Sequence, residues 1–189
     1  MTTCTVPVTA LRTSPYSLEW GSSVFAKVLA TNIYGNSLKS TEGNGAVITT
    51  SPDAPINLAE VVVERTKSTL GLSWDAAAFT GGDVIIDYRI SIAVQGSSFA
   101  VLASSLTDST YTATGLTFGT KYEFKVESRN SYGYSAYSST ETLLCAFIAD
   151  PPTTVSSTNL NDKVVFDWNT PVSNGSPITG YKLYIAQSD

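Results

Sequence analysis

Hydrophobic and polar residues alternate along most of the chain, in short runs that turn residues interrupt. A period of two, rich in Val, Ile, Thr and Tyr, is typical of β-strands with one buried face. Between Pro52 and Ala149 the pattern predicts seven strands, near 57–63, 68–74, 84–94, 98–103, 108–114, 120–130 and 136–145. Seven short antiparallel strands in about a hundred residues are typical of a β-sandwich. We therefore expect an all-β fold.

The alternation also predicts which side chains form the core. Trp74 should face inward from the second strand, beside Leu70 and Leu72. On the third and sixth strands the inward positions are Tyr88, Ile90, Ile92, Tyr122, Phe124 and Val126.

The chain repeats itself. Residues 18–40 align without a gap with residues 116–138, and 51–58 align with 148–155. The second match continues, with 70–75 aligned to 164–169 and 81–93 to 174–186. Repeats of this kind indicate tandem modules. We assign residues 1–50 to the C-terminal half of one module, 51–149 to a complete module and 150–189 to the N-terminal half of a third.

The repeated segment carries a family pattern. Residues 115–135 read "GLTFGTKYEFKVESRNSYGYS", after an opening Pro52, Trp74 in the second strand and Tyr88 in the third. This order resembles the fibronectin type III module, over nearly the whole chain. The resemblance implies a corner at Leu116–Tyr122, closed by the Tyr122 hydroxyl on upstream backbone. The first half module has Val24 at that position, so its corner must be held differently.

Composition excludes several classes of function. The net charge is −5 and no cluster of Lys and Arg stands out, which argues against nucleic acid as a partner. No apolar run approaches the length of a membrane span, so we expect no membrane insertion. Residues 1–30 lack the features of a signal peptide. If the protein is secreted, we expect its signal to lie outside this chain or to have been removed.

The residues do not favour an enzyme, a metal site or a cofactor. The chain has no His, the commonest general base and metal ligand. Its Ser and Thr residues have no candidate base beside them. Asp75, Asp83 and Asp87 lie around one loop, where we expect a solvated rim more than a calcium site. The stretch "TGG" at 80–82 is a turn without the strand-to-helix context of a phosphate loop. The resemblance likewise implies a spacer or binding module.

The loop "RNSYGYS" at 129–135 is the candidate ligand loop, because it and the residues after it carry Tyr132, Tyr134 and Tyr137. Exposed tyrosines can anchor a protein or glycan partner. Packing of the kind the family shows is the competing interpretation, which we favour. The loop lacks the Arg-Gly-Asp tripeptide with which some family members bind integrins.

Two further features concern the surroundings of the protein. We expect Cys4 at the start of a strand of the first half module and Cys145 at the end of the last strand of the complete one. Because they fall in different modules, we expect free thiols more than an intrachain disulfide; a bond to another chain or to a residue outside this segment is the alternative. The triplet "NGS" makes Asn174 a candidate N-glycosylation site in an exposed loop. Together with the family resemblance, it favours an extracellular or cell-surface glycoprotein.

The two half modules are complementary in the repeat. The alternation in residues 180–189 predicts a further strand, the third of its module. We expect inter-module or inter-subunit packing of its Tyr181, Leu183 and Ile185 against a face that carries Val24, Ala26 and Val28. That face would come from another copy or from the next stretch of one continuous chain. The function we expect is a structural filament or surface array of stacked modules, including head-to-tail complementation of half modules. A ligand-binding or adhesive fragment of a large surface receptor is the alternative.

Overall fold

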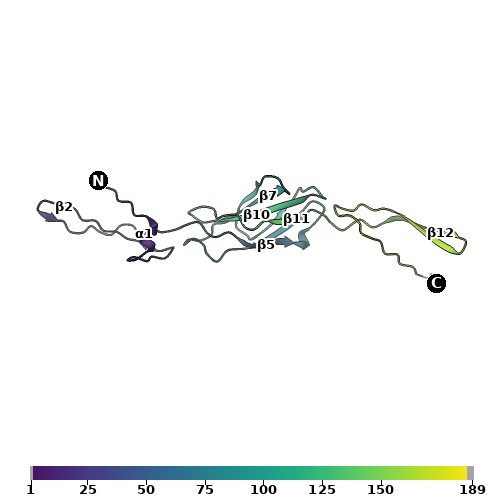
Figure 1. The fold of residues 1–189 in the computed structure, drawn as a ribbon, viewed down its shortest axis with the longest axis horizontal. Helices are drawn as coiled ribbons and strands as arrows, with labels where there is room; N and C mark the ends of the chain where they lie inside the picture. Colours follow the sequence, from purple (N-terminus) through teal and green to yellow (C-terminus); the bar gives the residue numbers. More distant parts are fainter. Residues whose placement is uncertain (1, 187–189) are drawn as a thin grey trace.

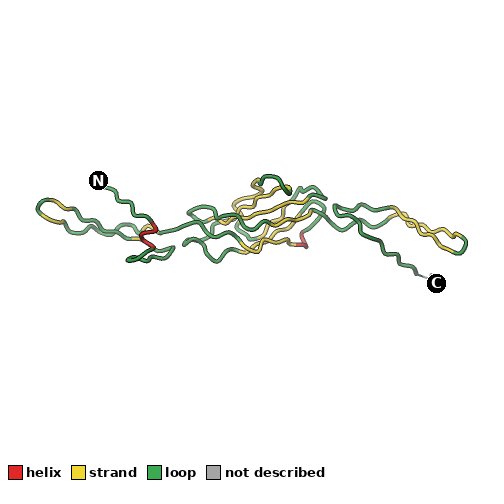
Figure 2. Tube along the Cα trace, in the orientation of Figure 1, coloured by secondary structure: helices red, strands yellow, loops and turns green. Residues whose placement is uncertain are grey.

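The structure, a computed structural model, describes residues 2–186 and consists of three units in a row (Figure 1). A central sandwich lies between two extended segments that contain far less strand (Figure 2). The N-terminal segment lies at one end of the long axis and the C-terminal segment at the other.

The central unit is a sandwich of two antiparallel sheets, as the alternation predicted. One sheet has the order β5-β6-β9 and the other the order β11-β10-β7-β8. The bounds are β5 Ile56–Val61, β6 Leu70–Asp75, β7 Asp87–Val94, β8 Ala100–Leu106, β9 Thr110–Ala113, β10 Lys121–Arg129 and β11 Glu141–Leu144. A short 3-10 helix, η1 Val62–Glu64, ends β5 earlier than the sequence predicted.

The core lies between the two sheets and contains the predicted residues. Leu70, Leu72 and Trp74 of β6 are buried, and they meet the inward side chains of the other sheet: Tyr88, Ile90, Phe124 and Val126. The rings of Trp74 and Tyr88 pack edge to face, with centroids 5.5 Å apart. Burial of these large apolar side chains is the main source of the sandwich's stability.

The corner before β10 is closed as the family resemblance implied. The Thr117 backbone N–H donates to the Tyr122 hydroxyl oxygen at 3.1 Å. The first segment keeps the same turn without the tyrosine, because the Ser22 N–H donates to the Glu19 carbonyl at 3.1 Å. Its corner is also tied by the Gly21 N–H to the Ile48 carbonyl at 2.9 Å.

The N-terminal segment is less regular than the complete module. It contains α1 Val8–Arg12 and four two-residue strands that form two pairs: β1 Ser23–Val24 with β4 Ala46–Val47, and β2 Thr31–Asn32 with β3 Gly35–Asn36. The prediction of a strand beginning at Cys4 was wrong, because a short helix forms shortly after it instead. A strand needs a neighbour for its backbone groups, and the segment contains only half of a module's strands.

The C-terminal segment is a hairpin followed by extended chain. β12 Thr153–Leu160 pairs with β13 Lys163–Asn169. We expected a further strand over 180–189; residues 180–186 form none, and 187–189 lie outside the described residues. In the central sandwich the equivalent strand, β7, lies between β10 and β8, and this segment has neither. The missing neighbours account for the missing strand.

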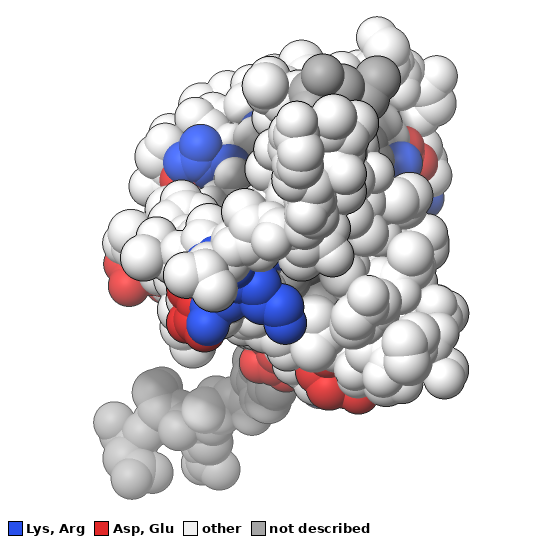
Figure 3. Space-filling view, turned by 90° about the vertical axis from the view of Figure 1, so that its left-hand side faces the viewer, with Lys and Arg blue, Asp and Glu red and all other residues white. Residues whose placement is uncertain are grey.

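Helix is nearly absent from the structure. The one α-helix among residues 2–186 has five residues, so none of the described helices could cross a bilayer. Viewed along the long axis from the N-terminal segment, the surface is mostly uncharged, with small groups of both signs (Figure 3).

Candidate functional site

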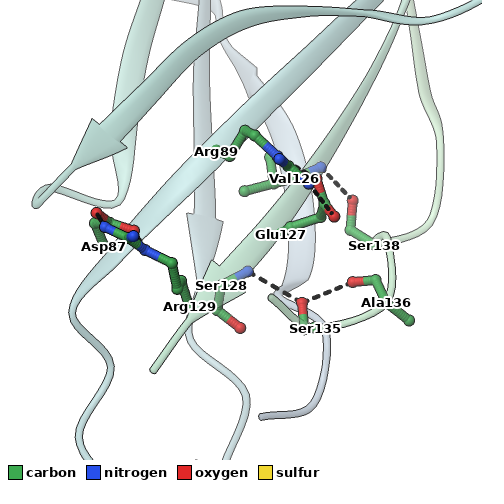
Figure 4. A network of polar contacts seen from close by, with 9 residues as sticks. All are labelled: Asp87, Arg89, Val126, Glu127, Ser128, Arg129, Ser135, Ala136 and Ser138. Carbon is green, nitrogen blue, oxygen red and sulfur yellow. Dashed lines mark hydrogen bonds and ion pairs between the residues drawn. The ribbon is translucent and has the colours of Figure 1, made fainter. Parts of the chain in front are cut away.

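Charged side chains form two ion pairs across β7 and β10, on the face of the sheet turned away from the core (Figure 4). Arg89 forms a bidentate ion pair with Glu127, in which Nε donates to Oε2 at 2.7 Å and Nη2 donates to Oε1 at 2.8 Å. Arg129 binds Asp87 in the same way, with Nε to Oδ1 at 2.9 Å. Bidentate contacts of this kind fix the relative orientation of the guanidinium and the carboxylate.

The pairing matters because the two carboxylates are buried. Asp87 is 4% exposed and Glu127 is 5% exposed. The hydrogen bonds that Arg89 donates to Glu127 raise the pKa of Arg89, and those that Arg129 donates to Asp87 raise the pKa of Arg129. A buried carboxylate left without its arginine would be costly, so the pairs fix the two strands in register.

Aromatic rings cover this polar face. The Arg89 guanidinium carbon lies 3.8 Å from the centroid of the Tyr134 ring, and that of Arg129 lies 5.4 Å from it. Lys125 Nζ lies 4.1 Å from the centroid of Phe99 and 5.4 Å from that of Tyr137. The face therefore carries cations stacked against aromatic rings, in the geometry of cation–π contacts.

Two serines replace part of the sheet after β10. Ser138 Oγ accepts the Val126 N–H and Ser135 Oγ accepts the Ser128 N–H, both at 3.0 Å. Each hydroxyl then donates to the next residue's carbonyl, that of Ser139 or Ala136. Both serines are buried, so these bonds satisfy backbone groups that water does not reach.

The same serine arrangement occurs in the N-terminal segment. Ser40 Oγ accepts the Val28 N–H at 3.0 Å, and Ser37 Oγ accepts the Ala30 N–H at 2.9 Å. In the repeat, Ser40 and Ser37 align with Ser138 and Ser135. Their constant spacing was the signal that could have revealed this arrangement.

The family model named Fibronectin type III domain matches residues 53–143. These residues are a fibronectin type III domain. The match covers the seven strands of the central sandwich almost completely.

The chain is also similar to curated proteins, and a solved structure shares its fold. The chain is 30% identical over 152 residues to a Kelch domain-containing protein of Saccharolobus solfataricus, covering 80% of this chain and 20% of that protein. It is 29% identical over 195 residues to M-protein, striated muscle, of Gallus gallus, covering 97% of this chain and 13% of that protein. A crystal structure of titin domains matches with a TM-score of 0.55 and 22% identity, covering 68% of this chain and 42% of that one. The chain thus spans a fifth or less of the length of these curated relatives.

The three tyrosines of the predicted ligand loop separate in the fibronectin type III domain. Tyr134 and Tyr137 lie on the sheet face with the cations. Tyr132 is 65% exposed and lines a hollow of about 460 Å³ with Val24, Ile48 and other residues of the N-terminal segment. The loop therefore contributes to both the sheet face and the border with the preceding module.

Asn174 does not occupy the exposed position that the sequence suggested. It is 3% exposed, and its Nδ2 donates to the Ile148 carbonyl at 2.7 Å and to Asp150 Oδ1 at 2.8 Å. The expectation of an exposed acceptor was wrong, because the amide nitrogen that would carry a glycan fastens the linker. The triplet "NGS" is explained by the turn it forms, in which the Ser176 N–H faces the Ser173 carbonyl at 3.4 Å.

The acidic residues near the 80–86 loop do not gather around one point. Asp87 pairs with Arg129, and Asp75 accepts a hydrogen bond from Asn57 at 2.9 Å. Ser131 holds the pKa of Asp83 below its ordinary value. Among residues 2–186 no group of three His, Cys, Asp or Glu side chains could hold a metal ion.

Both cysteines are free. Cys145 is buried in the core of the domain, where burial raises the pKa of its thiol, and Cys4 is exposed. A thiol held protonated in a core is poorly reactive.

Of the residues expected to pack between half modules, Val24 is half-buried and the others are exposed in this chain. Tyr181, Leu183 and Ile185 lie in the C-terminal segment, and Val24, Ala26 and Val28 lie in the N-terminal segment at the far end (Figure 1). The two sets therefore do not meet within one copy. Tyr181 packs edge to face on Trp168 instead, with centroids 5.4 Å apart.

Proposed function

We propose that this chain is a non-enzymatic structural segment of an extended array of fibronectin type III-like modules. The observation that carries the proposal is the linear succession of three module units along one axis (Figure 1). A chain built this way spans distance and places like surfaces at regular intervals. Its similarity to a striated-muscle M-protein over 97% of its length supports the same role.

The proposal includes completion of the half modules by like modules, from other copies or from neighbouring sequence. Ile185 is 74% exposed and Val28 is 70% exposed, although the equivalent positions of the central domain are buried or half-buried. Apolar faces of this kind associate in water. Because one segment supplies the front half of a module and the other the back half, their union is head to tail and open-ended.

An extracellular or cell-surface location and an adhesive role belong to the proposal as well. The family resemblance supports the location. The exposed rings of Tyr132 and Tyr137 would serve a protein or glycan ligand if the array is adhesive.

Electron microscopy and size-exclusion chromatography of the full chain test the assembly. We expect filaments whose length grows with protein concentration. Ile185→Asp should abolish them, because it places a charge in the face that must be covered. Val63→Asp is the matched control, since Val63 is an equally apolar exposed residue that belongs to η1 of the central domain and to neither half module. A monodisperse monomer at every concentration would contradict head-to-tail completion.

A further inference from the structure

The two linkers between modules have the same hydrogen bonds to the module that follows. At the first linker the Thr50 N–H donates to the Gly81 carbonyl at 2.9 Å. At the second, the Phe147 N–H donates to the Asn174 carbonyl, also at 2.9 Å. These are equivalent positions of the repeat, so one arrangement occurs twice.

A second pair of bonds follows the same rule. The Asp53 N–H donates to the Phe79 carbonyl at 3.1 Å, and the Asp150 N–H donates to the Val172 carbonyl at 3.0 Å. Each linker therefore runs as a short ladder beside the loop that follows the second strand of the next module.

That loop makes a tight turn with two successive residues in the left-handed region. Gly81 and Gly82 have φ of 78° and 82°, and Asn174 and Gly175 have φ of 52° and 91°. Two consecutive positive φ values define a type I′ turn, for which Gly-Gly and Asn-Gly are preferred. The sequence thus specifies the same turn at both sites.

The second glycine of each turn touches the corner glycine of the preceding module. A Cβ on Gly175 would lie 2.5 Å from the Gly119 nitrogen and 2.9 Å from the Cys145 carbonyl oxygen. A Cβ on Gly82 would overlap the Gly21 nitrogen and lie 2.8 Å from the Trp20 carbonyl carbon. No side chain fits at either contact.

The corner that contacts the turn, at Gly119 or Gly21, is held in place by a backbone hydrogen bond of its own module. The Gly119 N–H donates to the Cys145 carbonyl at 2.7 Å, and the Gly21 N–H donates to the Ile48 carbonyl at 2.9 Å. Each bond ties the corner to the end of its own module's last strand, where the linker begins. The corner therefore offers a backbone surface of constant shape.

Buried amides fasten both linkers. Asn130 Nδ2 donates to the carbonyls of Thr50 and Thr80 at 2.7 and 2.8 Å, and Asn130 is 2% exposed. At the second linker, Asn174 Nδ2 donates in the same way to the Ile148 carbonyl and to Asp150 Oδ1. Lys67 Nζ also binds Asp150 Oδ1, at 3.2 Å, and so joins the turn before β6 to the linker.

We propose that the corner glycine of one module and the glycine turn of the next form a specific docking surface that sets a single orientation between successive modules. The partner this surface fits is a like module with glycine at the second position of the turn. A module with any side chain there is excluded by overlap with backbone. This inference rests on the proposed array, and it adds how each module aligns the next.

A regular array follows from the repetition. Because the two joints between modules share the same backbone ladder and the same glycine contact, the same rotation and translation relate each module to the one before it. The array then extends with a constant rise and twist instead of bending freely at its linkers.

Amide hydrogen exchange, followed by NMR on the full chain, tests the docking surface. In the natural sequence we expect the Thr50 and Asp53 amides to be protected. Gly82→Ala should speed their exchange about tenfold or more, because the added methyl forces the turn off the corner. Gly96→Ala is the matched control: Gly96 has nearly the same φ, 81°, and no atom lies within 4 Å of its would-be Cβ. It carries the same backbone strain without the overlap, so it should leave these amides unchanged.

Equal exchange at Thr50 and Asp53 in the two variants, or no protection in the natural sequence, would overturn the inference. The Val126 amide in the core reports whether Gly82→Ala has unfolded the domain. If it has, Gly175→Ala gives the same test at the second joint, outside the central domain, with the Phe147 and Asp150 amides as reporters.

The outcome is independent of assembly. Protection of the joint amides is a property of one chain, whereas filament formation depends on contacts between chains. Protected amides without filaments would overturn head-to-tail completion and leave the docking surface standing. Filaments formed by chains whose joint amides are unprotected would overturn the docking surface and leave head-to-tail completion standing.

Discussion

Single polar atoms close the corners and joints of this molecule. The Tyr122 hydroxyl accepts the backbone N–H of Thr117, and the Asn174 amide holds two oxygens of the linker. Each of these atoms replaces water for a backbone group whose position fixes the path of the chain. Removing one of these polar atoms should therefore lower the free energy of unfolding, although it changes the volume of the side chain very little.

Tyr122→Phe removes the corner acceptor and keeps the packed ring. We expect a loss of about 1 kcal/mol in the free energy of unfolding, the usual size for one intramolecular hydrogen bond. Urea unfolding followed by tryptophan fluorescence would measure it. Tyr132→Phe is the control, because this exposed hydroxyl has no hydrogen bond among the described residues; an equal loss in both variants would contradict the role of the corner.

Asn174→Gly removes the linker's amide bonds and retains a residue suited to positive φ. We expect the Phe147 and Asp150 amides to exchange roughly tenfold faster, since two hydrogen bonds are lost, one to a carboxylate. Ser176→Ala destroys the glycosylation triplet but leaves Asn174 in place. If the triplet mattered only as a glycan acceptor, Asn174→Gly would leave exchange unchanged in unglycosylated protein.

At the scale of elements, the segment after β10 is held by serine hydroxyls where a regular strand would use backbone alone. The sequence predicted one strand over 136–145, yet β11 begins only at Glu141. Ser135 and Ser138 take the place of ladder partners for the buried strand β10. The segment keeps its register through these two hydroxyls together with the backbone N–H groups of Ser135 and Ser138, which donate to the Ser128 and Val126 carbonyls.

Ser138→Ala should destabilise the central domain by about 1–3 kcal/mol, because it leaves the buried Val126 N–H without its acceptor. Ser139→Ala, at an exposed neighbouring position whose backbone carbonyl alone is used, should be close to neutral. Thermal unfolding by calorimetry would compare the two. Equal midpoints would show that the hydroxyl contributes nothing to the strand.

The sequence predicted the elements whose pattern is set within the chain. The alternation identified the strands of the sandwich and the inward positions of Trp74 and Phe124, because period-two burial is a local property. It failed at Cys4 and over 180–186, where a strand depends on neighbours that the chain does not place beside it. It also failed at Asn174, because a burying contact with the linker leaves no periodic pattern.

The polar face shows the same division. The tyrosine-rich segment was visible in the sequence, but its stacking on Arg89 and Arg129 depends on the pairing of β7 with β10. The glycine contacts at the joints were invisible for a related reason. They join residues of different modules, and only the repeated geometry shows that Gly21 and Gly119 have equivalent partners.

At the scale of the whole molecule, the linkers set the orientation of each module relative to the next. The second linker contains a charged group, the Asp150 carboxylate. The Asp150 carboxylate accepts a hydrogen bond from Asn174 and one from Lys67, and these hold its pKa below the ordinary 3.8. A lowered pKa in the folded state means that the bonded, ionised form stabilises the joint. That contribution is complete above pH 3.8 and is lost as the pH falls through the lowered value.

The second joint should therefore loosen under acid. An NMR titration of the Asp150 side-chain carbonyl carbon should give a midpoint below 3.8, with the linker amide shifts of Phe147 changing over the same range. Asn174→Gly and Lys67→Met should each move the midpoint up towards 3.8, because the amide bond and the lysine both lower this pKa. Added salt should weaken the contribution of the lysine to the pKa shift, since Lys67 and Asp150 are both partly exposed, and leave most of the contribution of the amide.

A midpoint at or above 3.8, or one that Asn174→Gly does not move, would mean that the carboxylate takes no part in fixing the two modules. The orientation would then depend on the glycine contacts and backbone ladder alone.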